Sequence, residues 1–178
     1  VWIYPEIEPI SNFKITDYCN PLKGQLENKS LNGTSFTWTI KPSSSDGTAQ
    51  SITITTPTDK PNVSLDNNSA NADVTYTIGF NAKSDWTPVG GPVCSFDAPA
   101  ETVTVAPELG SGFKLNDNAF CSGEELVITD NSTGGNVTHT WLFGDGQSAS
   151  SLRGQPVKHV YNNASDADLT PVVTVTST

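Results

Sequence analysis

Towards its C-terminal end the chain reads Thr140-Trp141-Leu142-Phe143-Gly144-Asp145-Gly146, which predicts a β-strand followed by a tight turn. Trp141 and Phe143 alternate, so in an extended strand both rings point to one face. Gly144 and Gly146 tolerate positive φ, and Asp145 can hydrogen-bond its own backbone, which favours a turn. We therefore expect the two rings to fill the space between two sheets, where removing either would cost about 3–5 kcal/mol.

An earlier part of the chain has the same organisation. Thr37-Trp38-Thr39-Ile40 precedes Thr140-Trp141-Leu142-Phe143 by 103 residues (140 − 37). Four other pairs of segments occur in the same order at offsets of 100 to 103: Tyr4-Pro5-Glu6-Ile7 and Ala106-Pro107-Glu108-Leu109, Phe13-Lys14-Ile15 and Phe113-Lys114-Leu115, Cys19 and Cys121, and Glu27-Asn28-Lys29-Ser30 and Asp130-Asn131-Ser132-Thr133. A period near one hundred residues is typical of an independently folding domain, so the pattern indicates two copies of one module.

Apolar residues also alternate with period two at residues 35–40, 74–80, 102–105 and 173–176. Turn-forming pairs such as Asn32-Gly33, Asp46-Gly47, Gly90-Gly91 and Gly134-Gly135 lie before or between these runs. Short alternating runs between turn signals predict antiparallel strands, and no segment has a helical stripe. We predict an all-β chain of two tandem immunoglobulin-like β-sandwiches, each built from about seven strands.

The repeat also sets the expected domain boundaries. Residues 1–9 align with the end of the first copy and are predicted to be the last strand of a preceding module plus a linker. Residues 10–106 form the first sandwich, and residues 107–178 form a second sandwich that lacks its last strand. The chain has no Met and starts at Val1, so we expect a parent protein that continues on both sides.

The charge balance excludes one class of partner. The formal net charge is −10 and the pI is about 4.3, so the phosphates of a nucleic acid would be repelled. No apolar run approaches twenty residues, and we predict no direct membrane span.

The three cysteines admit two interpretations. In an oxidising compartment Cys19 and Cys94 could bridge the first and last strands of the first copy, and the partner of Cys121 would then lie beyond Thr178. In a reducing compartment all three would be free thiols. A zinc site is not expected, because the chain has no Cys-x-x-Cys pair and only two histidines.

Residues 141–146, followed by His159-Val160-Tyr161, resemble the PKD domain (polycystic kidney disease repeat), whose signature is Trp-Asp-Phe-Gly-Asp-Gly with a later His-x-Tyr. Leu142 departs from that signature. The first copy resembles the family more weakly: it keeps Trp38 but lacks the Gly-Asp-Gly turn. The resemblance implies that Trp38, Trp141, Phe143, Tyr161 and His159 are core residues, with His159 a structural hydrogen-bonder.

The first copy also carries Cys19-Asn20-Pro21, Asn28-Lys29-Ser30 and Trp38, and it ends in Val103-Thr104-Val105-Ala106-Pro107. This pattern of Cys-x-Pro, Asn-x-Ser, a Trp strand and a Val-x-Val-x-Pro ending looks like the tandem repeats of cell-surface adhesins that Bacteroidetes export by type IX secretion, some of them tied to gliding motility. This resemblance implies an extracellular location, with the bacterial outer surface as the expected site. It also implies that the chain's partners are other modules of the same protein and surface glycans or proteins.

Catalytic patterns are weak. The chain has no Gly-x-Ser-x-Gly, His-Glu-x-x-His or P-loop, and only His139 and His159 could serve a Ser-His-Asp arrangement. Glu124 and Glu125 are neighbours, so in a strand their carboxylates point to opposite faces. We therefore predict that the chain is not an enzyme and needs no cofactor.

Two binding sites stay open from the residues alone. Calcium could bind at one of three clusters of acidic and amide side chains, which are Asp66-Asn67-Asn68, Asp130-Asn131 and Asp166-Ala167-Asp168. Trp86, and less plausibly Trp2, could stack on a sugar ring.

We predict a non-catalytic structural and adhesive module of a large secreted or cell-surface protein, which spaces other modules and presents weak contacts. One alternative is an accessory region of a secreted hydrolase that binds polysaccharide or protein. Another is a subunit of an extracellular assembly in which the open end at Thr178 receives a strand from a neighbour.

Overall fold

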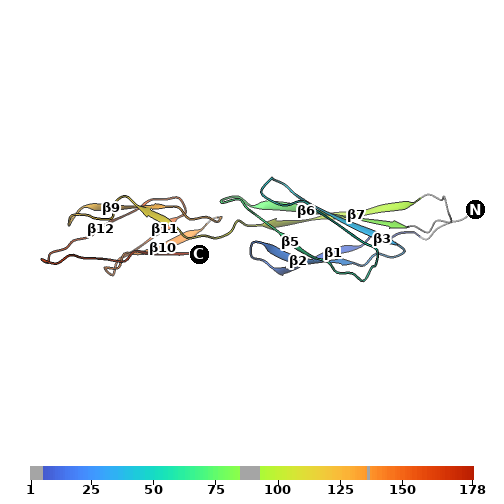
Figure 1. Ribbon diagram of the computed structural model, residues 1–178, viewed down its shortest axis with the longest axis horizontal. Helices are drawn as coiled ribbons and strands as arrows, with labels where there is room; N and C mark the ends of the chain where they lie inside the picture. Colours follow the sequence, from blue (N-terminus) through green and yellow to red (C-terminus); the bar gives the residue numbers. More distant parts are fainter. Residues whose placement is uncertain (1–5, 85–92, 136) are drawn as a thin grey trace, which may run out of the picture. The chain divides into compact units, whose positions relative to one another are not determined.

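The computed structural model describes residues 6–84, 93–135 and 137–178, and in these every regular element is a β-strand (Figure 1). The chain divides into two compact units, Val1–Pro107 and Glu108–Thr178, here called unit 1 and unit 2. The predicted all-β architecture with immunoglobulin-like sandwiches is confirmed.

The described part of unit 1 forms two antiparallel sheets, one with the order β1-β2-β5 and one with the order β4-β3-β6-β7. Its strands are β1 (Ser11–Asp17), β2 (Leu22–Asn28), β3 (Ser35–Pro42), β4 (Gln50–Ile54), β5 (Asn62–Leu65), β6 (Val74–Ser84) and β7 (Cys94–Val105). In Figure 1, β1 and β2 lie on one side of the unit and β6 and β7 on the other.

Alternation places the core of unit 1 between these sheets. In β3, Phe36, Trp38 and Ile40 are all buried, whereas the threonines between them are half-exposed. The facing sheet contributes Leu26 and Leu65, which are also buried. Period-two alternation thus gives each strand one apolar face, and the two apolar faces pack together.

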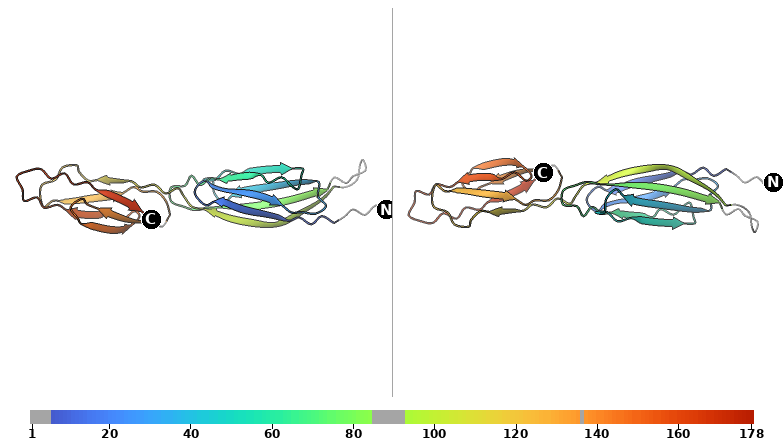
Figure 2. Two further views of the ribbon diagram at one scale, coloured as in Figure 1. Left: turned by 90° about the horizontal axis from the view of Figure 1, so that it is seen from below. Right: turned by 90° about the horizontal axis from the view of Figure 1, so that it is seen from above.

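Unit 2 repeats this order with one strand fewer among the described residues. Its sheets are β12-β9-β8 and β11-β10-β13. Its strands are β8 (Phe113–Leu115), β9 (Glu125–Asp130), β10 (Thr138–Leu142), β11 (Ser148–Leu152), β12 (Val157–Val160) and β13 (Thr174–Ser177). The first sheet corresponds to β1-β2-β5 and the second to β4-β3-β6, and Figure 2 shows the strands of each unit from two further sides.

The core of unit 2 is smaller but has the same origin. Leu126 and Ile128 from β9 face Trp141 from β10 and Phe143 just beyond it, and all four side chains are buried. Phe113 and Val175 pack against this core while remaining partly exposed.

Three contacts near the start of each unit correspond at a constant offset of 102 residues. Lys29 N–H donates to Ile10 O at 2.8 Å in unit 1, and Asn131 N–H donates to Gly112 O at 2.9 Å in unit 2. Leu31 N–H donates to Glu8 O at 3.2 Å, and Thr133 N–H donates to Gly110 O at 2.8 Å. Ser30 N–H donates to Asn28 Oδ1 and Ser132 N–H donates to Asp130 Oδ1, both at 2.9 Å. The segment that enters β1 or β8 is therefore held against the end of β2 or β9 in the same way in both units.

Candidate functional site

The turn after β10 is built from the Gly-Asp-Gly triplet. Gly144 and Gly146 have φ of 80° and 88°, a region that favours glycine. The Asp145 carboxylate accepts a hydrogen bond from Gln147 N–H at 3.0 Å. A Cβ at Gly144 would lie only 2.7 Å from the carbonyl oxygen of Val172, so close packing against that segment also requires glycine there.

His159 joins this turn to β12. Its ring stacks on Phe143 with centroids 3.9 Å apart, and its Nε2 lies 2.7 Å from Asp145 Oδ2. Tyr161 meets the imidazole edge-on at 4.5 Å and donates its hydroxyl proton to Phe143 O at 2.7 Å. These residues form a closed cluster in which every polar atom named has a protein partner.

The electrostatics of the cluster follow from these contacts. The hydrogen bond from Gln147 N–H is the main cause that lowers the pKa of Asp145, and His159 adds to it against the opposing effect of burial. Burial, together with the nearby Asp145 charge, raises the pKa of Tyr161. Asp145 is therefore an ionised acceptor and Tyr161 a protonated donor at neutral pH.

Trp141 and Trp38 occupy corresponding places in the two units, and neither is exposed to solvent. Trp141 Nε1 donates to Ser151 Oγ at 2.9 Å, and Phe113 meets its ring edge-on at 5.5 Å. Trp38 packs on Phe80 at 4.7 Å, and its Nε1 has no hydrogen-bond partner among the described residues. The two indoles therefore share a position but differ in polar surroundings.

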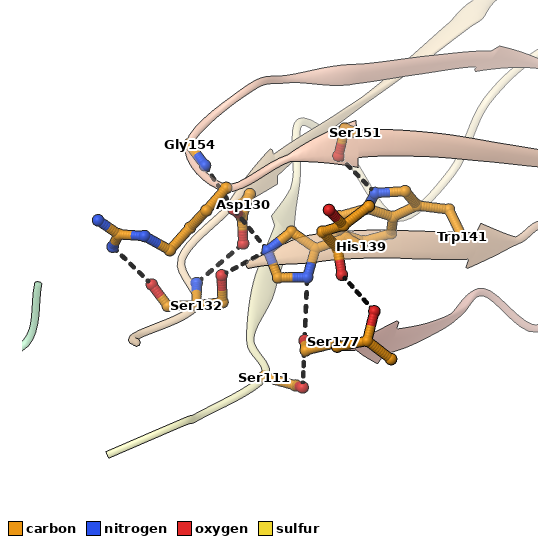
Figure 3. A network of polar contacts seen from close by, with 11 residues as sticks. Ser111, Asp130, Ser132, His139, Trp141, Ser151, Gly154 and Ser177 are labelled. Atoms are coloured by element: carbon orange, nitrogen blue, oxygen red, sulfur yellow. Dashed lines mark hydrogen bonds and ion pairs between the residues drawn. The ribbon is translucent and has the colours of Figure 1, made fainter. Parts of the chain in front are cut away.

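A polar network that the sequence interpretation missed surrounds His139, whose exposed fraction is 0% (Figure 3). On one side of the imidazole, Nε2 lies 2.8 Å from Ser132 Oγ and 3.2 Å from Asp130 Oδ2. On the other side, Nδ1 lies 2.9 Å from Ser177 Oγ, which itself lies 2.7 Å from Ser111 Oγ. The network connects the end of β9, strands β10 and β13, and the segment before β8.

Asp130 is the charged group of this network, and its side chain is 1% exposed. Burial acts to raise the pKa of Asp130, but hydrogen bonds from Ser132 and Gly154 N–H, together with His139, outweigh it and lower that pKa. Gly154 N–H lies 2.6 Å from Oδ2. The buried carboxylate is thus ionised and bonded on both oxygens.

The equivalent positions in unit 1 carry apolar or neutral residues. Strand register places Phe36 where unit 2 has His139. The cross-strand partners of Phe36 are Ile54 and Ala82, whereas those of His139 are Ser151 and Ser177. The offset of 102 places Asn28 where unit 2 has Asp130. Asn28 Nδ2, like Trp38 Nε1, has no partner among the described residues. Unit 2 therefore has all four polar groups, from His139, Asp130, Ser151 and Ser177, and unit 1 has none of them at the corresponding positions.

Asp130, His139 and Ser177 stand in series, an order also found in hydrolytic triads. In this chain the imidazole is enclosed, and the Ser177 hydroxyl already contacts Ser111. A substrate carbonyl would need access to the serine and nearby N–H donors aimed at its oxygen. What the described contacts do is tie β13 to the rest of unit 2.

The acidic clusters considered for calcium are largely used within the protein. Asp130 accepts N–H groups from Ser132 and Gly154. The Asn67 amide donates to Ala72 O and Val105 O, and its oxygen accepts Ser69 N–H. Within residues 6–84, 93–135 and 137–178, no group of three or more His, Cys, Asp or Glu side chains is arranged to hold a metal ion.

The predicted Cys19–Cys94 disulfide is wrong, since both thiols are free and lie at opposite ends of unit 1. Asn20, next to Cys19, accepts Asn67 N–H, and Asn67 donates to Val105 O. Val105 ends β7 and Cys94 begins it, eleven residues away. At about 3.3 Å per residue the strand spans roughly 36 Å, whereas a disulfide requires Cα atoms within about 7 Å.

Two residues considered for sugar stacking, Trp86 and Trp2, lie outside the described residues. The described aromatic side chains with high exposure are Tyr18, at 79%, and Phe96, at 45%. Neither was singled out by the sequence pattern.

Comparison with known proteins agrees with the fold and the turn cluster. Unit 2 combines an immunoglobulin-like sandwich with a Gly-Asp-Gly turn whose aspartate contacts His159. Residues 102–174 match the PKD domain family. That stretch includes the end of β7 and nearly all of unit 2. No curated protein matches the chain, and no described helix is long and apolar enough to cross a membrane.

Proposed function

We propose that this chain is a structural and adhesive part of a larger secreted or cell-surface protein. In it, tandem PKD-type modules act as spacers and present weak contacts to proteins or glycans. The observation that carries this proposal is the match of residues 102–174 to the PKD domain family, whose members occur in extracellular proteins. The bacterial outer surface, type IX secretion and a role in gliding belong to the proposal.

The tandem arrangement is supported by the constant offset of 102 residues in the three contacts described above, and by the shared strand order of the two units. A spacer needs units that unfold cooperatively and separately. The two separate cores provide this, because Trp38 and Trp141 each anchor their own cluster. Repetition of such units also multiplies weak contacts along one chain.

Force spectroscopy of the chain held at its two ends tests the spacer role. Two unfolding events are expected, and at about 3.6 Å per extended residue the 71 residues of unit 2 (178 − 108 + 1) release roughly 25 nm. Unfolding in one event, or without a resolvable force, would contradict the proposal.

A pull-down on chitin, cellulose and collagen, with Trp86→Ala as the matched variant, tests the binding role. Retention of the chain on a polysaccharide that is lost in Trp86→Ala would favour the accessory region of a hydrolase over the spacer. Retention on collagen that is unchanged in the variant would support an adhesive contact elsewhere on the chain.

A further inference from the structure

The turn that leads into β3 contains the single Asn-Gly pair of the chain, Asn32-Gly33. Asn32 is exposed and has φ of 61°, and among the described residues it is the one residue other than glycine with positive φ. Asparagine tolerates this region better than most residues do, because its short polar side chain can bond to nearby backbone. The local conformation therefore favours asparagine at position 32.

Packing requires glycine at the next position. A Cβ at Gly33 would lie only 2.5 Å from Cε1 of Phe36, whose side chain is buried. The N–H of Gly33 has no acceptor among the described residues. Because Gly33 has no side chain and its N–H is not bonded, its backbone nitrogen is open to attack on a neighbouring carbonyl carbon.

The Asn32 side chain holds the segment that enters unit 1. Its Nδ2 donates to Glu6 O at 2.8 Å. Next to this contact, Leu31 and Glu8 exchange backbone hydrogen bonds at 3.2 and 3.3 Å. Between Glu6 and Glu8, Ile7 is 3% exposed and belongs to the core of unit 1. The carboxamide of Asn32 thus contributes to keeping Ile7 in the core.

Unit 2 makes the same contact without a carboxamide. The offset of 102 residues places Gly134, with φ of 117°, where unit 1 has Asn32. The carbonyl of Glu108, which corresponds to the carbonyl that Asn32 binds, accepts the hydroxyl of Thr133 at 3.2 Å. In unit 1 the residue in the place of Thr133 is Leu31, whose side chain has no donor. Of the two units, unit 1 alone makes this contact through a group that hydrolysis converts into an acid.

We propose that Asn32 is a self-modification site, at which the backbone of unit 1 displaces the side-chain amide and so releases the segment at residues 6–9. The Gly33 nitrogen bonds to Cγ of Asn32, and Nδ2 leaves as ammonia with the proton of the Gly33 N–H, which closes a succinimide ring. Water then adds to one of the ring carbonyls, and the bond from that carbonyl to the Gly33 nitrogen breaks. The product is an aspartate or, where the main chain now runs through the side-chain carbonyl, an isoaspartate.

This inference goes beyond the spacer function, and water is the only other reactant. The product lacks the donor and carries a charge. A carboxylate at position 32 cannot donate to Glu6 O, so that two acceptors would face each other. It would also join the carboxylates of Glu6, Glu8 and Asp97, which line a cavity of about 650 Å³ together with Asn32 and without a Lys or Arg among the described lining residues. Like charges this close repel, so both effects separate the entering segment from the turn.

Peptide mapping of the 178-residue chain tests the reaction. The folded chain is incubated at neutral pH, and mass spectrometry with fragmentation follows the replacement of NH₂ by OH at each asparagine. Asn118 is the internal control, because it is also exposed but precedes Ala119, whose Cβ shields the backbone nitrogen. Conversion at Asn32 is expected to be at least tenfold faster than at Asn118. Asn32→Gly, which supplies the residue that unit 2 has, should show no conversion in this turn.

Hydrogen exchange measures the release of the segment. Asn32→Asp represents one product, and in this variant the Glu8 N–H, which donates to Leu31 O, should exchange at least fivefold faster. Leu31 is 56% exposed, so its replacement is tolerated. Adding Leu31→Thr to Asn32→Asp restores a donor of the kind that Thr133 provides in unit 2, and it should slow this exchange again by at least twofold.

The proposal is overturned if Asn32 converts no faster than Asn118, or if it converts only in the denatured chain. It is also overturned if Asn32→Asp leaves the exchange of the Glu8 N–H unchanged, or if Leu31→Thr does not slow that exchange. Failure of these experiments leaves the pull-down and the force measurement unaffected, so the spacer function is judged separately.

Discussion

Replacing His139 by Phe would give unit 2 the residue that unit 1 has at the same place. The change removes the imidazole that lies 3.2 Å from Asp130 Oδ2 and leaves a carboxylate that is 1% exposed. Leaving a buried polar group without one of its hydrogen-bond partners costs about 1–3 kcal/mol, and more when the group is charged. Because the Gly154 and Ser132 N–H groups still bind Asp130, we expect a loss of about 3 kcal/mol.

A double-mutant cycle separates the contact between Asp130 and His139 from simple packing. Asp130→Asn together with His139→Phe reproduces the Asn28 and Phe36 pair of unit 1, in which no buried charge is present. The double variant should therefore be more stable than the sum of the two single changes predicts, by about 2 kcal/mol. Phe36→His in unit 1 is the matched control, and it should destabilise that unit because the amide Asn28 stands there in the place of the carboxylate Asp130.

Hydrogen exchange followed by mass spectrometry in increasing urea reads the two units separately, because peptides from residues 108–178 report on unit 2 alone. A unit of 71 residues (178 − 108 + 1) has a free energy of unfolding of roughly 4–10 kcal/mol. A loss of about 3 kcal/mol should lower its Tm by roughly 12–24 °C. Strictly additive single effects, or a loss below about 1 kcal/mol for His139→Phe, would refute the reasoning.

Three further outcomes are expected. Trp38→Ala and Trp141→Ala should each cost about 3–5 kcal/mol in their own unit and leave exchange in the other unit unchanged; loss of protection in both units would contradict separate cores. Because the pKa of Asp130 in the folded unit lies below its ordinary value, unit 2 should keep its stability above about pH 4 and lose part of it as the pH falls further. Acid titrations followed by circular dichroism measure this loss, and Asp130→Asn should make the stability of unit 2 less dependent on pH. Alkylation of the denatured, unreduced chain should label Cys19 and Cys94, and a mass that shows both blocked would restore the disulfide.

The strands could be predicted because their signal is local. The alternation at residues 35–40 becomes β3 with its three apolar side chains buried, and residues 74–80 lie in β6. The Gly-Asp-Gly turn is equally local, since positive φ and an Asp side chain that binds the next amides require no distant partner. The period-two alternation of apolar residues therefore predicts the strands, and the turn residues predict the turn at Asp145, from the sequence alone.

The disulfide could not be judged in this way, because it depends on strand direction. Spacing along the chain placed Cys19 and Cys94 near the two limits of one module, but it does not say which end of β7 faces Cys19. The contacts that decide this, Asn20 to Asn67 and Asn67 to Val105, join residues 47 and 38 positions apart. Only the folded chain brings them together.

The His139 network lies between these two cases. Its geometry is long-range, since Ser177 is 38 positions from His139. Its presence nonetheless leaves a trace in the comparison of the two copies. The sequence offset of 103 set Asp130 against Glu27, but the matching contacts of Ser30 and Ser132 show that Asp130 stands in the place of Asn28. His139 stands in the place of Phe36. A buried carboxylate such as Asp130 is tolerated where a buried imidazole such as His139 contacts it. In unit 1, where Phe36 replaces the imidazole, the uncharged amide Asn28 replaces the carboxylate. Differences between internal copies that occur in pairs therefore point to buried contacts that either copy alone would hide.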